Sequence, residues 1–406
     1  MMDRRAELIT IFLIMFTEIL GFSLIIPVLP YFATYLGASP LVVGLILTIF
    51  SLCQFISAPI FGKLSDKFGR KPLLLVSQAS TFAGFLILAF ANSLELVFLS
   101  RIIDGLLGSN FSLSRAYLGD IVEPRDQKRM FGYLGAVGGH GFFIGPAIGG
   151  FMATVDYSLP FLVAAGISLL SIVLVVVFLK ETVVKEKEVK IKLDDIFPLR
   201  DLVGGFKSSI FRPFLLMYLC FVLAHTMLTS SVALFADYQL DVGPDVVGLY
   251  LMFVGLLRIL FQTTAYPRLV KTFSTTILLL TGFLSMLVAF IGVFLVKSPV
   301  IMFLILGTFS IGSGIARPTL SSEISSRASL KTRGRLMGVA DSLQSLAQII
   351  TPLIGGYIIE HLEPGLLGVA AAIIVLPALT VVFLTARNKT TETTKTDIPI
   401  SMPADL

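Results

Sequence analysis

The chain has 406 residues, of which 55% are hydrophobic and 14% are charged, and its mean hydropathy is +0.92. Soluble proteins carry about 25% charged residues, so this composition excludes a soluble protein and predicts a chain that crosses a membrane many times. The net charge of +5 does not indicate nucleic-acid binding, because most Lys and Arg residues fall in the segments that we assign to the cytoplasm, where basic residues set the orientation of membrane proteins.

The apolar runs along the chain are about as long as the ~20 residues that a helix needs to cross a bilayer. The first run is too long for the apolar part of a signal peptide, so we expect it to be retained. Cys53 and Cys220 fall inside predicted spans and do not indicate a redox compartment. We predict twelve transmembrane helices over residues 8–34, 41–61, 73–91, 95–118, 130–153, 158–180, 213–236, 244–265, 275–296, 299–318, 335–360 and 365–386.

An even number of spans places both termini on one side of the membrane, and the basic loops assign that side to the cytoplasm. Residues 181–212 mix both signs of charge and are predicted to link two halves, residues 1–180 and 213–386. Residues 387–406 are polar and rich in Thr, so we expect a disordered cytoplasmic tail. The predicted architecture is therefore an all-α membrane protein of two six-helix bundles in the cell membrane.

Two short blocks recur between the halves. Val42-Val43-Gly44-Leu45 returns as Val246-Val247-Gly248-Leu249, and Arg129 to Gly150 aligns without gaps on Arg335 to Gly356. Repeats of this kind are typical of transporters in which two bundles rock around a site between them.

Five charges lie in the ten residues from Gly62 to Lys71, between two apolar runs. The pattern predicts a tight turn at the cytoplasmic face, in which glycines permit close approach and positive φ. A loop that only sets topology would explain the basic residues but not Asp66.

The sequence Gly-x-Leu-Ser-Asp-x-x-Gly-Arg-Lys resembles the signature loop between helices 2 and 3 of the major facilitator superfamily. The resemblance implies a conformational switch in which Asp66 docks on the start of a helix in the other half and Arg70 pairs with Asp120 or Glu123. The second-half counterpart, Tyr266 to Phe273, lacks the glycines and the Asp, so the switch is predicted to be asymmetric. The switch residues implied are Gly62, Asp66, Gly69, Arg70, Lys71 and Asp120.

A run of small residues from Gly141 to Gly150 lies in the predicted fifth helix. Its spacing permits close helix packing, and Pro146 allows a kink. Packing alone would account for these features, but the pattern also resembles the antiporter signature of the superfamily, which is associated with drug–proton exchange. The residues of this motif are Gly141, Gly145, Pro146, Gly149 and Gly150.

Arg101 and Asp104 are one turn apart in the predicted fourth helix, on one face, where they can pair. Arg101 could instead extend to the membrane surface. The position resembles a superfamily motif whose Arg is linked to proton transfer, and Asp104 departs from that motif. Asp104 is a candidate counter-ion or proton carrier.

Glu18 lies near the middle of the first predicted helix. A carboxylate there is costly unless it is paired, protonated or in a wet cavity. Glu18 precedes Pro27-Val28-Leu29-Pro30 by a spacing that resembles tetracycline efflux proteins. We predict a role in proton coupling or substrate binding, and the alternative is a structural hydrogen bond to a neighbouring helix.

The second half offers further polar candidates. Asp341, Gln344 and Gln348 share a helix face that could line a cavity or pack against another helix. His225 is more consistent with packing than with proton transfer, and Arg258 is deep enough to need a partner, which Glu18 or Asp341 could supply.

Arg115, Lys180 and Arg317 are predicted to anchor the helices at the inner membrane surface. The predicted ninth helix carries no charge, which argues against tetracycline itself as the substrate.

The sequence carries no Walker loop, metal-ligand cluster or Ser/His/Asp constellation, so we predict no enzyme, cofactor or metal site. The resemblance implies proton-coupled efflux of small, largely apolar compounds from a cavity surrounded by helices 1, 4, 7 and 10. Two alternatives remain: a metabolite or sugar symporter or uniporter of the same fold, and a receptor or scaffold that transports nothing. The predicted partners are a small-molecule substrate, protons and lipid, with no nucleic acid, and the protein is predicted to be a monomer.

Overall fold

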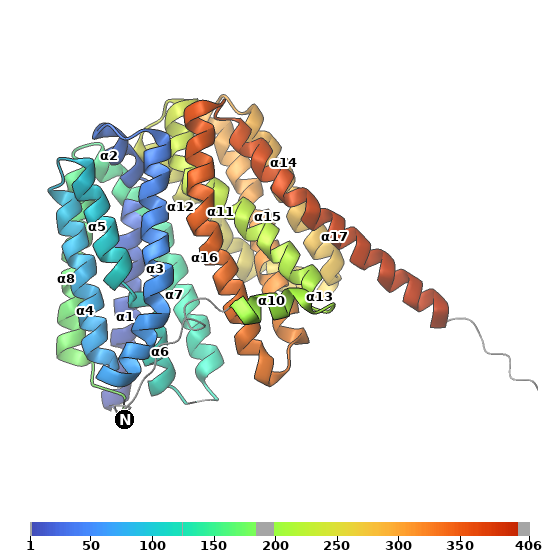
Figure 1. Cartoon of the computed structure of the whole chain (residues 1–406), viewed down its shortest axis with the longest axis horizontal. Helices are drawn as coiled ribbons and strands as arrows, with labels where there is room; N and C mark the ends of the chain where they lie inside the picture. Colours follow the sequence, from blue (N-terminus) through green and yellow to red (C-terminus); the bar gives the residue numbers. More distant parts are fainter. Residues whose placement is uncertain (1, 124, 184–198, 397–406) are drawn as a thin grey trace, which may run out of the picture.

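The computed structural model describes residues 2–123, 125–183 and 199–396, and within these ranges the regular structure is helical. Eleven helices in the described part of the chain are long and apolar enough to cross a membrane, and Gly141–Ala153 adds a shorter apolar helix. These twelve segments correspond to the twelve predicted spans. Figure 1 shows them as two bundles side by side, the first coloured blue to green and the second yellow-green to red.

The first bundle contains the eight helices α1 (Met2–Ile25), α2 (Leu29–Tyr35), α3 (Pro40–Phe68), α4 (Arg70–Ala89), α5 (Leu94–Leu107), α6 (Asn110–Ile121), α7 (Gln127–Ala153) and α8 (Ser158–Phe178). Within it α4 packs against α8 and α5, and α1 packs against α7 and α8. Pro27 has no backbone N–H to donate, which accounts for the break between α1 and α2 inside one span.

The second bundle contains α11 (Arg212–Leu240), α12 (Pro244–Leu260), the π-helix η1 (Phe261–Ala265), α13 (Tyr266–Thr272), α14 (Thr275–Leu295), α15 (Pro299–Arg327), α16 (Leu330–His361) and α17 (Leu366–Thr396). Four long helices of the protein begin with proline in their first turn, where a missing N–H costs nothing. The core of this bundle is formed by α11 against α16 and α17, and by α14 against α15 and α17.

The fourth predicted helix is broken in the structure. It divides into α5 and α6 at Gly108 and Ser109, where side chains replace the lost helical bonds: the Ser109 N–H donates to Ser77 Oγ at 2.7 Å, and the hydroxyls of Ser57 and Ser109 are 2.9 Å apart. Glycine is a poor helix former, which is consistent with the position of the break at Gly108. The prediction of one continuous helix over 95–118 is therefore wrong at this point.

Two predicted loops are largely helical. Residues 62–68 continue α3, and the turn is confined to Gly69, whose φ of 107° suits a residue without a Cβ. Gly62 lies within the helix and does not form the turn. In the second half, residues 266–272 form α13 after the π-helix, because the chain absorbs Pro267 by widening the preceding turn.

The ends of the second bundle also differ from the predictions. Helix α17 continues to Thr396, so the predicted disordered tail begins too early; no Gly or Pro interrupts the chain between Pro377 and Pro399. Part of the predicted linker forms α10 (Leu199–Lys207), which packs against α11 and α16. Residues 184–198 and 397–406 lie outside the described residues.

The two bundles meet through α3 against α16 and α7 against α12. We call the end of the molecule near Pro40 the Pro40 end and the opposite end the Gly69 end. Near Pro40, Thr48 Oγ1 donates to the Ile349 carbonyl at 2.8 Å, Tyr31 Oη donates to the Val242 carbonyl at 2.6 Å, and Glu360 Oε2 accepts from Leu41 N at 2.8 Å. The halves are therefore joined tightly at the Pro40 end.

The repeated sequence blocks form these inter-bundle contacts. A Cβ on Gly44 would collide with the Pro352 carbonyl, and a Cβ on Gly248 would collide with the Pro146 carbonyl. Gly356 and Gly150 make equivalent backbone contacts with Pro40 and Pro244. The internal repeat thus encodes a pseudo-symmetric closure in which backbones approach because the side chains are absent.

Candidate functional site

A cavity of about 480 Å³ lies between the two bundles. Its walls come from α1, α3, α5 and α7 of the first bundle and from α11, α12, α15 and α16 of the second, together with two residues of α2. The predicted helices 1, 4, 7 and 10 (α1, α5, α11 and α15) are all present in the wall, and α3, α7, α12 and α16 complete it. A pocket of this volume accommodates one drug-sized molecule.

A chain of polar side chains crosses the interior of the first bundle. Asn110 Nδ2 donates to Glu18 Oε1 at 2.8 Å and to Thr81 Oγ1 at 2.9 Å, and Thr81 Oγ1 donates to Asp104 Oδ1 at 2.8 Å. Gln78 Nε2 donates to the other oxygen of Glu18 at 3.2 Å. Glu18 is therefore joined through neutral side chains to Asp104 on another helix.

Arg101 connects this chain to the cavity. Its guanidinium lies 3.5 Å from Asp104 Oδ2 and over the rings of Phe50 and Phe85, at 5.5 and 5.9 Å from their centroids. Arg101 lines the cavity, whereas Glu18 and Asp104 lie behind the wall. The predicted pairing of Arg101 with Asp104 is present, and the alternative that Arg101 extends to the membrane surface does not fit its burial.

In the second bundle, His225, Gln344 and Gln348 line the cavity. The His225 ring lies 5.4 Å from that of Phe221 and 5.2 Å from that of Phe309, and Gln344 Nε2 donates to Thr226 at 3.3 Å. This face of α16 therefore both lines the cavity and packs on α11.

Arg258 and Arg317 also line the cavity, so the prediction that Arg317 only anchors the helix at the surface is wrong. Asp341 lies outside the wall and is exposed, with Arg115 and Arg317 as its charged neighbours. Because Arg115 belongs to the other bundle, Asp341 lies near the space between the halves on the Gly69 side. Neither Glu18 nor Asp341 forms an ion pair with Arg258 among the described residues.

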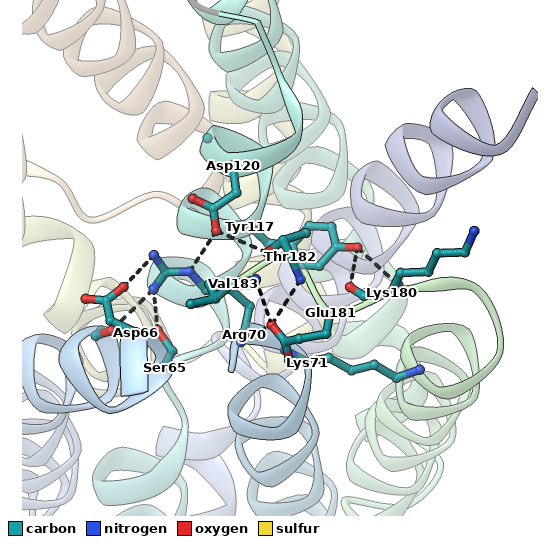
Figure 2. A network of polar contacts seen from close by, with 12 residues as sticks. Ser65, Asp66, Arg70, Lys71, Tyr117, Asp120, Lys180, Glu181, Thr182 and Val183 are labelled. Carbon is teal, nitrogen blue, oxygen red and sulfur yellow. Dashed lines mark hydrogen bonds and ion pairs between the residues drawn. The ribbon is translucent and has the colours of Figure 1, made fainter. Parts of the chain in front are cut away.

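The polar network at the Gly69 end is shown in Figure 2. Arg70 lies between two carboxylates, 2.6 Å from Asp66 Oδ1 and 2.9 Å from Asp120 Oδ2, and it also donates to Ser65. In this conformation Asp66 pairs within its own bundle, and no helix start in the described part of the other half forms a contact with it. Glu123, the other partner considered for Arg70, lies 3.0 Å from Arg125.

Two further contacts fix the turn. Glu181 accepts from the backbone N–H groups of Arg70 and Lys71, at 2.8 and 3.3 Å, and so neutralises the start of α4. Lys71 Nζ donates to the carbonyls of Val176 and Leu179, at 2.9 and 2.7 Å, at the end of α8. The loop thus ties α3, α4, α6 and α8 together in this state.

The glycines of α7 form two packing surfaces. A Cβ on Gly141 would meet Ile19 at 3.1 Å, and Cβ atoms on Gly145 and Gly149 would collide with Ser23 and the Leu24 carbonyl of α1. On the other surface, Gly150 and Pro146 contact α12. Helix α7 is therefore held between a helix of its own bundle and a helix of the other.

Sequence reasoning missed the residues that connect these charges. Gln78, Thr81 and Asn110 are neutral, and the signal that could have found them is a polar side chain inside an apolar run. Glu181 lies at the boundary of the predicted linker and was not considered as a partner for the loop.

Comparison with known proteins adds evidence that is independent of this geometry. The family model described as Major Facilitator Superfamily matches residues 11–347 and again residues 214–401. The chain is 30% identical to the tetracycline resistance protein, class H, of Pasteurella multocida over 363 residues, covering 87% of this chain and 89% of that protein. It is 25% identical to the quinolone resistance protein NorA of Staphylococcus aureus (strain MRSA252) over 359 residues, covering 88% and 91%.

Among solved structures, a mutant of the nucleoside transporter NupG aligns with a TM-score of 0.76 at 12% identity, covering 93% of this chain and 98% of that one. At this identity the likeness concerns the fold alone.

Proposed function

Because the chain belongs to the major facilitator superfamily, we propose that it is a secondary active transporter that exports drug-like, largely apolar compounds in exchange for protons. Relatives named for tetracycline and quinolone resistance support export of drugs. In this proposal the protein is a monomer in the cell membrane, the Gly69 end and both termini face the cytoplasm, and nucleic acid is no partner.

The observation that carries the proposal is the hydrogen-bonded chain from Glu18 to the cavity wall. Both Glu18 oxygens accept from amide N–H groups, which is the arrangement that an ionised carboxylate requires. Asn110 Oδ1 is buried, and no described residue forms a hydrogen bond with it. It offers an acceptor to a protonated Glu18 once the amide has rotated, so the same residues serve both protonation states.

The hydrogen-bonded chain also allows protonation of an acid to change the cavity. Protonation of Glu18 or Asp104 weakens the ion pair that binds Arg101 to the first bundle. Arg101 pairs with Asp104, and the Thr81 hydroxyl donates to Asp104 and accepts from Asn110. Arg101 then presents more of its positive charge to the cavity. A change of protonation behind the wall thereby alters what the wall binds.

The two ends of the molecule support alternating access. The Pro40 end is closed by backbone contacts, whereas Asp341 is exposed toward the Gly69 end. Release on the far side requires these contacts to separate and the Gly69 end to close. In that second state Asp66 would leave Arg70 and reach the start of a helix in the second bundle, where a carboxylate meets unpaired N–H groups.

Transport into everted membrane vesicles tests the proposal. Uptake of tetracycline and of a fluorescent quinolone is measured with an imposed proton gradient, without one, and with an uncoupler. We expect accumulation that requires the gradient and is lost with the uncoupler. Downhill movement alone would indicate a uniporter, accumulation with the opposite gradient would indicate a symporter, and no movement of any compound would favour a receptor or scaffold.

A further inference from the structure

The cavity carries a positive charge that no described residue of its wall balances. We propose that Arg258 binds the anionic group of an amphiphilic organic anion, so that the preferred substrates are organic acids with an aromatic or aliphatic body. That these compounds are transported rests on the proposed function, whereas their binding rests on the geometry of the cavity.

The charges that line the cavity are of one sign. Arg101, Arg258 and Arg317 are in the wall, and among the described lining residues none is Asp or Glu. Glu18, Asp104 and Asp341 all lie outside the wall. A ligand in this cavity therefore meets guanidinium groups directly and carboxylates only through other residues.

Two of the three arginines are compensated. Arg101 has Asp104 at 3.5 Å and two aromatic rings. Arg317 has the exposed carboxylate of Asp341 as a charged neighbour and the hydroxyl of Tyr218 close by. Their charges are accordingly shared with groups of the protein.

Arg258 has no such compensation. It lies in the middle of the span Pro244–Thr272, and no described residue forms a hydrogen bond, ion pair or ring contact with its side chain. Its charged neighbour is Arg317, which has the same sign, and the ring of His225 is close to both. An unpaired guanidinium away from bulk water is costly, and an anionic ligand would remove that cost.

The rest of the wall selects the body of the ligand. Aromatic and aliphatic side chains from both bundles dominate it, including Phe22, Leu47, Phe50, Phe142, Leu251 and Phe309. An inorganic anion would leave these surfaces unfilled, whereas an organic acid fills them and places its carboxylate or sulfonate on Arg258. The planar guanidinium binds such groups through two parallel hydrogen bonds.

The charge of the substrate has a consequence for energetics. Exchange of one monovalent cation for one proton moves no net charge, whereas export of a monovalent anion against one proton moves two charges in the favourable direction. The membrane potential acts on every charge moved. Export of the anion should therefore respond to the potential as well as to the pH gradient.

Binding is measured with three probes that share one ring system: pyrenebutyrate, pyrenebutanol and pyrenebutylamine. The chain contains no Trp, so Phe142→Trp places a single energy donor in the cavity wall. Energy transfer to pyrene then reports occupancy of the cavity in the purified full-length protein. Acetate serves as a competitor that has the charge without the apolar body.

We expect pyrenebutyrate to bind about tenfold more tightly than pyrenebutylamine, since a charge-assisted hydrogen bond is worth a factor of this order. Arg258→Gln should remove this preference and leave pyrenebutanol unchanged, and Arg258→Lys should retain most of it. Arg268→Gln, an exposed arginine of the same bundle, should change none of the affinities. Acetate should not displace pyrenebutyrate.

The inference is wrong if the Phe142→Trp protein, with Arg258 retained, binds pyrenebutylamine as tightly as pyrenebutyrate. This comparison does not depend on whether a variant at Arg258 folds. It is also wrong if Arg258→Gln weakens all three probes equally, or if acetate competes as well as an organic acid does.

Transport of the same probes separates this inference from the proposed function. If pyrenebutyrate binds at Arg258 and no compound is exported, the anion site stands and the exporter proposal fails. If pyrenebutylamine is exported with protons while pyrenebutyrate neither binds nor moves, the exporter proposal stands and the anion site fails. Collapsing the membrane potential with valinomycin and potassium should slow export of pyrenebutyrate.

Discussion

The two bundles contain similar helices but differ in the partners that they provide for their interior charged residues. In the first, Glu18, Asp104 and Arg101 belong to one hydrogen-bonded chain through Thr81 and Asn110. In the second, Arg258 faces the cavity with no partner among the described residues. A hydrogen-bonded network can hold or pass a proton without a ligand, whereas an unpaired cation is stabilised only when a ligand arrives.

The bundles are alike where they meet and unlike elsewhere. The closure at the Pro40 end repeats Gly44 against Pro352 as Gly248 against Pro146. The loop at Gly69, with its carboxylate and glycine turn, has no equivalent in α13. This difference predicts that equivalent substitutions will act equally at the closure and unequally at the loop and in the interior.

The largest effect is expected at the loop. Asp66→Asn should abolish turnover while the protein stays folded, because the amide cannot provide the charge that holds Arg70 in one state and meets a helix start in the other. Lys271→Gln in the second-half counterpart should leave most of the turnover. Export rates in everted vesicles, with thermal unfolding as a check on folding, measure both, and export by Asp66→Asn at the unsubstituted rate would contradict the switch role.

The next largest effect concerns the closure that the halves share. Gly44→Val and Gly248→Val should impair transport to a similar degree, since each new side chain collides with a backbone carbonyl of the other bundle. Overpacking costs about 1–3 kcal/mol, which lowers the ratio of closed to open states by roughly 5- to 150-fold. Gly166→Val, where a Cβ meets nothing within 4 Å, is the matched control.

Accessibility measures this shift directly. In a background without Cys53 and Cys220, Ser51→Cys places one thiol in the cavity wall. An impermeant thiol reagent added from the Pro40 side should label it faster in both valine variants than in the parent. If only one variant shows faster labelling, the closure is not shared equally.

A smaller effect is expected inside the first bundle. Thr81→Val keeps the shape of the side chain but removes the hydroxyl that joins Asn110 to Asp104. A net loss of about 1 kcal/mol of hydrogen-bond energy should reduce proton-driven accumulation roughly fivefold. In Thr281 the hydroxyl donates to carbonyls of its own helix, so Thr281→Val should leave accumulation unchanged. An equal effect of both substitutions would show that the hydrogen-bonded chain through Thr81 does not contribute to proton coupling.

Much of the fold could be predicted from the sequence, because twelve apolar runs and basic loops follow directly from the cost of burying charge in lipid. The repeat blocks were also visible, since the closure needs glycine and proline at fixed positions. The helix break at Gly108 was harder to predict: it is stabilised by Ser57 and Ser77 on other helices, and no local pattern shows those contacts.

The site was predicted in its charged residues and missed in its connections. A carboxylate or guanidinium in an apolar run is conspicuous, so Glu18, Arg101 and Arg258 could be chosen from sequence. Packing of the whole bundle decides which helix faces oppose each other. The link through Asn110, and the lack of a partner for Arg258 within the described part of the chain, could therefore not be predicted. The partner of Asp66 depends in addition on the conformation, which a sequence does not specify.

The separation of proton and substrate sites between the bundles is tested most directly by comparing Glu18→Gln with Arg258→Gln in two assays. The first assay is binding of pyrenebutyrate, and the second is proton-driven accumulation of the neutral pyrenebutanol in everted vesicles. Glu18→Gln should retain pyrenebutyrate binding and lose accumulation, whereas Arg258→Gln should bind pyrenebutyrate about tenfold more weakly and still accumulate the alcohol. If both variants fail in both assays while remaining folded, proton and substrate share one site and the account is contradicted.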